Sequence, residues 1–168
     1  MQETPQQYTQ RILGNLDGQK PLTVLAATPN KLSRIVSRVS AAKLSKRPAP
    51  GKWSVAEIAA HLADAEIVLA WRVRSVLGAP GTPIQAYDQD AWAKTGQYQK
   101  RNARDSVALF KAVRTANLAL YESLSPEQWK LYGMHSERGQ ESLEHIVGMI
   151  AGHDLNHLQQ IERAITGK

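Results

Sequence analysis

Two histidines four residues apart, His153 and His157, are the clearest candidates for chemistry in this chain. On a helix, residues i and i+4 lie on the same face, so both imidazoles would point in the same direction. Ile146, Ile150 and Ile161 fall on the same stripe, which predicts that the two histidines occupy core positions. Buried imidazoles need partners, and a zinc, nickel, copper or iron ion would bind both of them. The spacing is equally compatible with two hydrogen-bonded histidines at the edge of a bundle.

A third histidine, His61, lies beside the apolar stripe of another predicted helix, close to Ile58 and Ala65. Alone, such a histidine is more typical of a hydrogen-bonded core residue than of a metal ligand. Three inward-facing histidines on two helices favour a metal site. Three neutral ligands with open positions are typical of a catalytic zinc site rather than a structural one.

The remaining two histidines fit this cluster less well. His145 precedes His153 by eight residues, which turns it by about 80° and displaces it by about 12 Å along an ideal helix. His135 lies in the loop before the last helix, from which it could reach the mouth of a pocket. We interpret both as ordinary surface histidines.

Two other metal motifs do not match. A metalloprotease helix reads His-Glu-x-x-His, whereas Asp154 is one carbon shorter than glutamate and no third ligand follows downstream. A ferritin-like bundle with two metals needs Glu-x-x-His on two helices, and this chain has only Asp154-x-x-His157. We therefore expect one metal ion rather than two.

The periodicity of the apolar residues predicts four longer helices and no strand. The helices run from Pro29 to about Ser40, from Ser54 to about Leu77, from about Arg104 to Leu124 and from Ser142 to Thr166. A shorter helix is expected near residues 5–15. We predict an all-α four-helix bundle with a short additional N-terminal helix, forming a single domain over residues 1–168 with its core at about 25–166.

Capping patterns predict where two of these helices begin. Thr28 would be the N-cap of the first long helix, with Pro29 in its first turn. Ser54 and Glu57 form a capping-box pattern at the start of the second. Residues 79–102 form a long connection, which in a small bundle is either functional or partly ordered by its own aromatic residues.

The composition limits the classes of protein to consider. The 168 residues include no cysteine, and no apolar run approaches the roughly 20 residues needed to span a bilayer. With a polar N-terminus, these features predict a cytoplasmic protein. The net charge is +6, and eight basic residues but no acidic one lie between Gly18 and Ala56. This stretch could attract nucleic acid or an anionic small molecule, but a solvated surface is the commoner explanation and no nucleic-acid-binding motif is present.

The sequence resembles the DinB-like (YfiT-like) superfamily of metal-binding four-helix bundles. The resemblance rests on KWSVAEIAAHLADAE, from Lys52 to Glu66, and on HDLNHLQQI, from His153 to Ile161. It extends over about residues 25–166. It implies that His61, His153 and His157 bind one divalent transition metal ion, most often zinc or nickel.

The same resemblance implies chemistry on a small molecule. Characterised members of the superfamily resemble transferases that use a low-molecular-weight thiol as cosubstrate, one branch isomerises maleylpyruvate, and others are described as metal-dependent hydrolases. Homodimers are common among them, so a homodimer is expected here. Asp64, one turn beyond His61, and Asp154 are candidates for hydrogen bonds that orient the ligand imidazoles, although for Asp154 we favour a solvated carboxylate.

Three functions stay open at this point. A metal-dependent enzyme of the thiol S-transferase or hydrolase kind ranks first and requires an open coordination position beside a pocket. A non-catalytic metal-binding or stress protein ranks second and would have the pocket closed by side chains. A basic nucleic-acid-binding bundle ranks last and would be indifferent to the three histidines.

Overall fold

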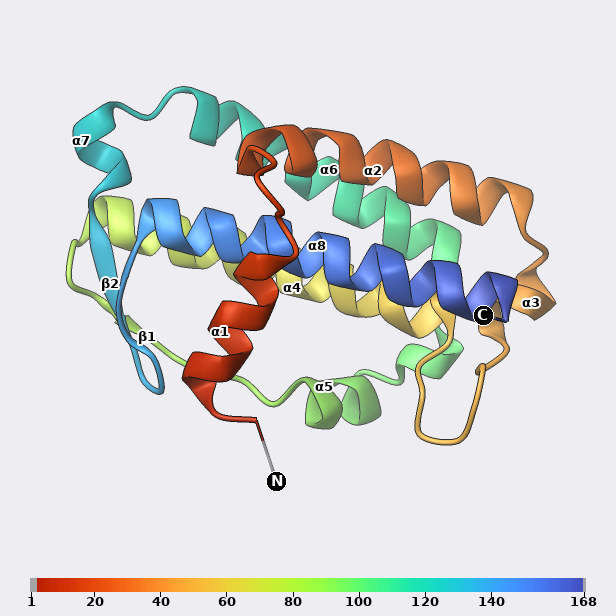
Figure 1. Cartoon of the computed structure of the whole chain (residues 1–168). Coiled ribbons are helices and arrows are strands. Elements are labelled where there is room, and N and C mark those ends of the chain that lie inside the picture. The colour runs from red at the N-terminus through yellow and green to blue at the C-terminus, as the bar shows by residue number, and fades with distance from the viewer. Residues whose placement is uncertain (1–2, 168) are drawn as a thin grey trace.

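Four long helices form the body of the protein in a computed structural model that describes residues 3–167 (Figure 1). They are α2 (Pro21–Arg38), α4 (Val55–Gly78), α6 (Ala103–Glu122) and α8 (Leu143–Thr166). The shorter helices are α1 (Pro5–Gly14), α3 (Ala41–Ser45), α5 (Gln89–Thr95) and α7 (Pro126–Trp129), with a 3-10 turn at Tyr98–Lys100. No helix in this part of the chain combines the length and the apolar character that crossing a membrane requires. The predicted all-α bundle with a short N-terminal helix is confirmed.

Local capping explains where the two helices with the clustered histidines begin. At the start of α4, Ser54 Oγ accepts a hydrogen bond from the Glu57 N–H, and the Glu57 carboxylate accepts one from the Ser54 N–H at 2.8 Å. Before α8, Ser142 Oγ accepts from the His145 N–H at 3.1 Å. The helix ends at Gly167, whose φ of 73° favours glycine. Both helices therefore begin where the sequence predicts.

Apolar side chains form two core clusters along the bundle. One cluster includes Ile58, Phe110 and Ile161, and the other includes Val73 and Ile150. Each such side chain contributes about 1.5–3 kcal/mol when fully buried. Along α8, His153 and His157 lie between a residue of one cluster and a residue of the other, so apolar packing positions them from both sides.

The helix α2 begins at Pro21 rather than at Pro29. The prediction of Thr28 as an N-cap is wrong, because Thr28 is buried within the helix and its hydroxyl donates to a carbonyl one turn earlier at 2.9 Å. Pro29 has no N–H, so the carbonyl of Leu25 lacks its usual helical donor. Arg114 Nη1 supplies a donor instead, 3.2 Å from the Leu25 oxygen. A contact from another helix thus compensates for the proline.

A small three-stranded sheet lies at one end of the bundle (Figure 1). Its strands are β1 (Pro83–Ile84), β2 (Tyr132–His135) and β3 (Gly139–Ser142). β2 and β3 pair antiparallel, with His135 opposite Gly139, and β1 pairs parallel to β2. The prediction of no strand is therefore wrong. Strands of two and four residues are too short for an alternating pattern to be visible in the sequence.

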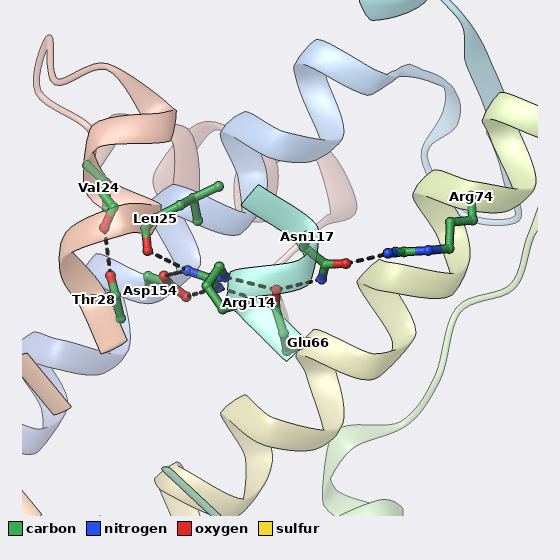
Figure 2. Close-up of polar contacts among 8 residues, drawn as sticks. All are labelled: Val24, Leu25, Thr28, Glu66, Arg74, Arg114, Asn117 and Asp154. Atoms are coloured by element: carbon green, nitrogen blue, oxygen red, sulfur yellow. Dashed lines mark hydrogen bonds and ion pairs between the residues drawn. The ribbon is translucent and has the colours of Figure 1, made fainter. Parts of the chain in front are cut away.

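A buried ion-pair network joins all four long helices (Figure 2). The Arg114 guanidinium in α6 lies 2.8 and 2.9 Å from the carboxylate oxygens of Glu66 in α4, and 2.6 and 3.2 Å from those of Asp154 in α8. It also reaches Leu25 in α2, and Asn117 donates to Glu66 at 2.7 Å. Burial acts to lower the pKa of Arg114, but the two carboxylates raise it above its ordinary value. One side chain therefore holds the four helices in a single arrangement.

Replacement of Arg114 by methionine should destabilise the protein by about 3–5 kcal/mol, because Glu66 and Asp154 would remain buried without a counter-ion. Urea unfolding followed by circular dichroism measures the change. The triple variant Glu66→Gln, Arg114→Met, Asp154→Asn has no buried charge and should recover part of the loss. An Arg114→Met variant as stable as the wild type would contradict this role of the network.

The short helix α1 lies across α8 (Figure 1) and comes closest to it at Gly152. A Cβ atom at Gly152 would lie 2.1 Å from the carbonyl oxygen of Ile12, a distance that no real side chain tolerates. Asn15 Nδ2 donates to the Gly152 carbonyl at 3.2 Å, which fixes the same crossing point. The two backbones therefore approach closely next to His153 because residue 152 has no side chain.

Gly152→Ala should destabilise the protein by about 1–3 kcal/mol, because the backbone at Ile12 must move to admit a methyl group. Gly148→Ala is the matched control on the same helix, since a Cβ there would meet only the flexible end of Leu13 at 3.3 Å. That control should be neutral or stabilising by up to about 1 kcal/mol, because alanine favours helix. Equal unfolding free energies for the two variants would argue against the close crossing.

Candidate metal centre

The three predicted ligands lie together between α4 and α8. His61 Nε2 and His157 Nε2 each lie 3.0 Å from His153 Nε2, and one ring nitrogen of each residue lies within 4.8 Å of the others. The i, i+4 spacing places His153 and His157 on one face of α8, with ring centroids 4.4 Å apart. The arrangement predicted from spacing alone, three imidazoles converging from two helices, is therefore present.

Two neighbouring side chains fix the orientation of the rings. His157 Nδ1 lies 3.0 Å from Gln160 Oε1, so we assign the proton to Nδ1, which leaves the Nε2 lone pair directed at the other histidines. The indole of Trp53 packs against His61 with ring centroids 5.1 Å apart. Neither contact is among those predicted from the sequence. Helical spacing could have indicated Gln160, which lies three residues beyond His157 on the same helix.

Burial keeps the three imidazoles neutral. His61 is 1% exposed and His157 is 4% exposed, whereas His153 is only partly buried. Burial lowers the pKa of His61 to about 4. Burial and repulsion from His61 lower the pKa of His157 to about 3, and burial and the other two rings lower that of His153 well below 6.5. Neutral imidazole is the form that binds a metal ion.

Two of the three separations between the nitrogen atoms fit a metal ion. With metal–nitrogen bonds of about 2.0–2.1 Å, two ligand nitrogens lie about 2.9 Å apart at a right angle and about 3.4 Å apart at the tetrahedral angle. Both observed separations of 3.0 Å fall within this range. Hydrogen bonds alone suit the cluster less well, because His153 Nε2 can offer only one proton or one lone pair to its two neighbours.

The two carboxylates expected to orient the imidazoles make other contacts. Asp64 accepts hydrogen bonds from Tyr98 Oη at 2.9 Å and from Arg101 Nη1 at 2.7 Å. Asp154 is 1% exposed and paired with Arg114, so its interpretation as a solvated carboxylate is wrong. Within residues 3–167, neither carboxylate is hydrogen-bonded to a clustered histidine. For Asp154 the reason is geometric, since adjacent residues on a helix point about 100° apart.

A cavity of about 690 Å³ extends from His153, between α1, α4, α8 and the β2–β3 hairpin. Its apolar lining consists of side chains from α4 and α8, namely Ala65, Leu69, Ile146, Met149 and Ile150. Its polar lining includes aromatic and charged side chains, among them Tyr8, Arg72, Tyr87 and Arg138. Of the three clustered histidines, His153 lines this cavity. The proposed ligand set therefore borders a space large enough for a small molecule.

The other two histidines differ in their surroundings. His135 lines the cavity and is 4% exposed, so its interpretation as a surface residue is wrong, although its expected position near a pocket is confirmed. Its Nδ1 accepts a hydrogen bond from the Glu137 N–H at 3.2 Å. Burial, and to a smaller extent repulsion from Arg138, lowers the pKa of His135. His145 is partly exposed, 3.6 Å from Glu141, and does not line the cavity.

Comparison with known sequences identifies relatives over most of the chain. The family model described as the DinB superfamily matches residues 25–161. The Bacillus subtilis protein named "Putative metal-dependent hydrolase YfiT" is 26% identical over 143 residues, which cover 84% of this chain and 80% of that protein. The Oceanobacillus iheyensis protein named "Putative metal-dependent hydrolase OB0413" is 24% identical over 137 residues, covering 82% and 79% of the two chains.

Comparison with solved structures agrees with these relatives. The structure of Bacillus subtilis YfiT, described as having an unusual four-helix bundle topology, has a TM-score of 0.80 at 26% identity and covers 88% of this chain and 85% of its own. A mycothiol-dependent maleylpyruvate isomerase has a TM-score of 0.64 at 14% identity, covering 86% and 65% of the two chains, which shows a shared fold alone. Because the family model spans most of the sequence, including all three clustered histidines, this chain belongs to the DinB superfamily.

Proposed function

We propose that this protein binds one divalent transition metal ion, zinc or nickel, through His61, His153 and His157, and is a metal-dependent enzyme acting on a small molecule. The observation that supports the proposal is the convergence of three neutral imidazole nitrogens, 3.0 Å apart in two pairs, at the end of a cavity of about 690 Å³. Three neutral nitrogen ligands beside an accessible space are typical of catalytic rather than structural zinc sites.

Two residues next to the cluster, Gln160 and Trp53, have a part in this proposal. A bound ion would supply Lewis-acid chemistry, by lowering the pKa of a water molecule or by binding a cosubstrate thiol as its thiolate. Gln160 holds His157 in the tautomer whose Nε2 is free to bind. Trp53 covers one side of His61, so that access to the cluster is from the side of His153.

Two reaction classes suit such a site. Hydrolysis is favoured by the relatives, which are named as metal-dependent hydrolases. A thiol S-transferase is the alternative, since a bound ion can also hold a thiolate and the isomerase that shares the fold depends on mycothiol. A non-catalytic metal-binding protein is the second candidate, because two of the three histidines are almost completely buried. The cavity beside His153 favours the enzyme.

Untagged protein purified without chelator should contain close to one zinc or nickel ion per chain, measured by elemental mass spectrometry. Replacement of any one of the three clustered histidines by alanine should weaken binding by at least about 100-fold, because each ligand contributes several kcal/mol to a tetrahedral or octahedral site. His145→Ala, on the same helix as two of the ligands, is the control and should bind normally. Correctly folded wild-type protein that takes up neither zinc nor nickel would refute the metal site.

The metal-free protein should lose stability as the pH falls from 7 to 5. The pKa values of His61 and His157 are about 4 and about 3 in the folded chain and near 6.5 when unfolded, so the unfolded chain binds more protons in this interval. Each of these histidines should therefore cost roughly 2 kcal/mol of unfolding free energy between pH 7 and pH 5.

Urea unfolding at both pH values, compared with the His61→Ala, His153→Ala, His157→Ala triple variant, measures this effect. The variant should lose much less stability over the same interval. Added zinc should stabilise the wild type more at pH 7 than at pH 5, because protons compete with the metal ion for the ligands. An equal loss in the variant and the wild type would show that other groups cause the pH dependence.

A further inference from the structure

The cavity is lined along its length by one face each of α4 and α8, which run antiparallel (Figure 1). On α4, Ala65, Leu69 and Arg72 line the cavity at helical spacing, so two apolar side chains precede an arginine, and His153 of α8 lines the cavity beside the histidine cluster. The seven residues of helix from Ala65 to Arg72 correspond to about 11 Å. The cavity therefore has a histidine end and an arginine end with apolar surface between them.

At the arginine end, Arg72 has no counter-ion among residues 3–167. Its Nη2 donates to the carbonyl of Gln85, and its guanidinium lies 5.7 Å from the centre of the Tyr87 ring. No carboxylate oxygen of the described residues lies within 4.0 Å of a guanidinium nitrogen of Arg72, the limit for an ion pair. Burial lowers the pKa of Arg72 and outweighs the opposing effects of Tyr87 and Glu141, whereas the two carboxylates paired with Arg114 raise the pKa of that side chain. A guanidinium has five donors, so most of those of Arg72 remain available.

The other charged groups that line the cavity have partners or face solvent. Arg138 forms two hydrogen bonds with the buried carboxylate of Glu141, at 2.6 and 3.1 Å. Glu3 is bound to Arg11, which is outside the lining.

The remaining two carboxylates lie toward the surface. Asp88 accepts hydrogen bonds from two backbone N–H groups at the start of α5, at 2.9 and 3.0 Å. Glu137 is exposed to solvent. The inner charged group formed by Arg72, Arg138 and Glu141 thus has a net charge of about +1, with the excess charge at Arg72.

We propose that Arg72 binds the carboxylate of a small molecule whose apolar middle lies along Leu69 and Ile150 and whose reacting group lies beside His153. A carboxylate matches one free guanidinium in charge and in bidentate geometry. A phosphate monoester would add a second negative charge next to Glu141, which already neutralises Arg138. The proposal rests on the proposed function for its reacting end only; the carboxylate end is independent of any metal.

Cobalt-substituted protein and three six-carbon thiols test the proposal: 6-mercaptohexanoate, 6-mercaptohexanol and 6-mercaptohexyl phosphate. The cobalt–thiolate absorption band reports binding at the histidine end, and its dependence on ligand concentration gives the dissociation constant. The carboxylate should bind about 10- to 100-fold more tightly than the alcohol, because a charge-assisted hydrogen-bonded pair replaces a neutral group. Arg72→Gln should abolish this preference while the band itself remains, and Arg72→Lys should keep part of it.

Arg38→Gln is the matched control, since it removes one charge from an exposed position on α2 and should leave all three constants unchanged. Equal binding of the carboxylate and the alcohol by the wild type would overturn the proposal, whatever the stability of the Arg72 variants. Tighter binding of the phosphate would assign the arginine end to phosphate esters instead.

Calorimetric titration of metal-free protein with hexanoate separates this proposal from the proposed function. Binding that Arg72→Gln weakens about 10-fold or more, in a protein that fails to hold cobalt, would support the carboxylate site and refute the metal site. A normal cobalt–thiolate band together with hexanoate binding that Arg72→Gln does not change would support the metal site and refute the carboxylate site.

Discussion

The guanidinium of Arg114 contacts all four long helices at a position closed to water. It belongs to α6, pairs with Glu66 of α4 and Asp154 of α8, and donates to the Leu25 carbonyl of α2 (Figure 2). Water cannot substitute for any of these partners, so no helix can shift without leaving a charge or a carbonyl unpaired. Asn117 extends the network by bridging Glu66 and Arg74.

This constraint also determines which way the histidines face. Glu66 lies five residues beyond His61 on α4, and Asp154 is adjacent to His153 on α8, so on each helix the carboxylate and the imidazole point in different directions. Once both carboxylates are bound to Arg114, the rotation of each helix about its own axis is fixed. The imidazoles are then directed toward one another. The ion pairs and the histidine cluster therefore depend on the same packing of the helices.

The features that can be predicted from the sequence are those that depend on residues close together in the chain. The i, i+4 histidine pair and the capping box at Ser54 depend on neighbours within one helical turn, and the structure contains both. The misplaced start of α2 has a different origin, because the Leu25 carbonyl that Pro29 leaves without its helical donor accepts a hydrogen bond from Arg114, 89 residues further along the chain. The burial of Asp154 likewise depends on a partner on another helix. Such pairings leave no periodic trace in the chain.

The short helix α1 contributes to the cavity but not to the histidine cluster beside it. It precedes residue 25, where the match to the family model begins, yet Glu3, Thr4, Pro5 and Tyr8 form part of the cavity wall. The three histidines thus lie in the part of the chain that the family model matches, whereas one wall of the cavity comes from residues outside that match. Substitutions at the four α1-side residues that line the cavity would therefore change the shape and polarity of the cavity while leaving in place the two helices that supply the histidines.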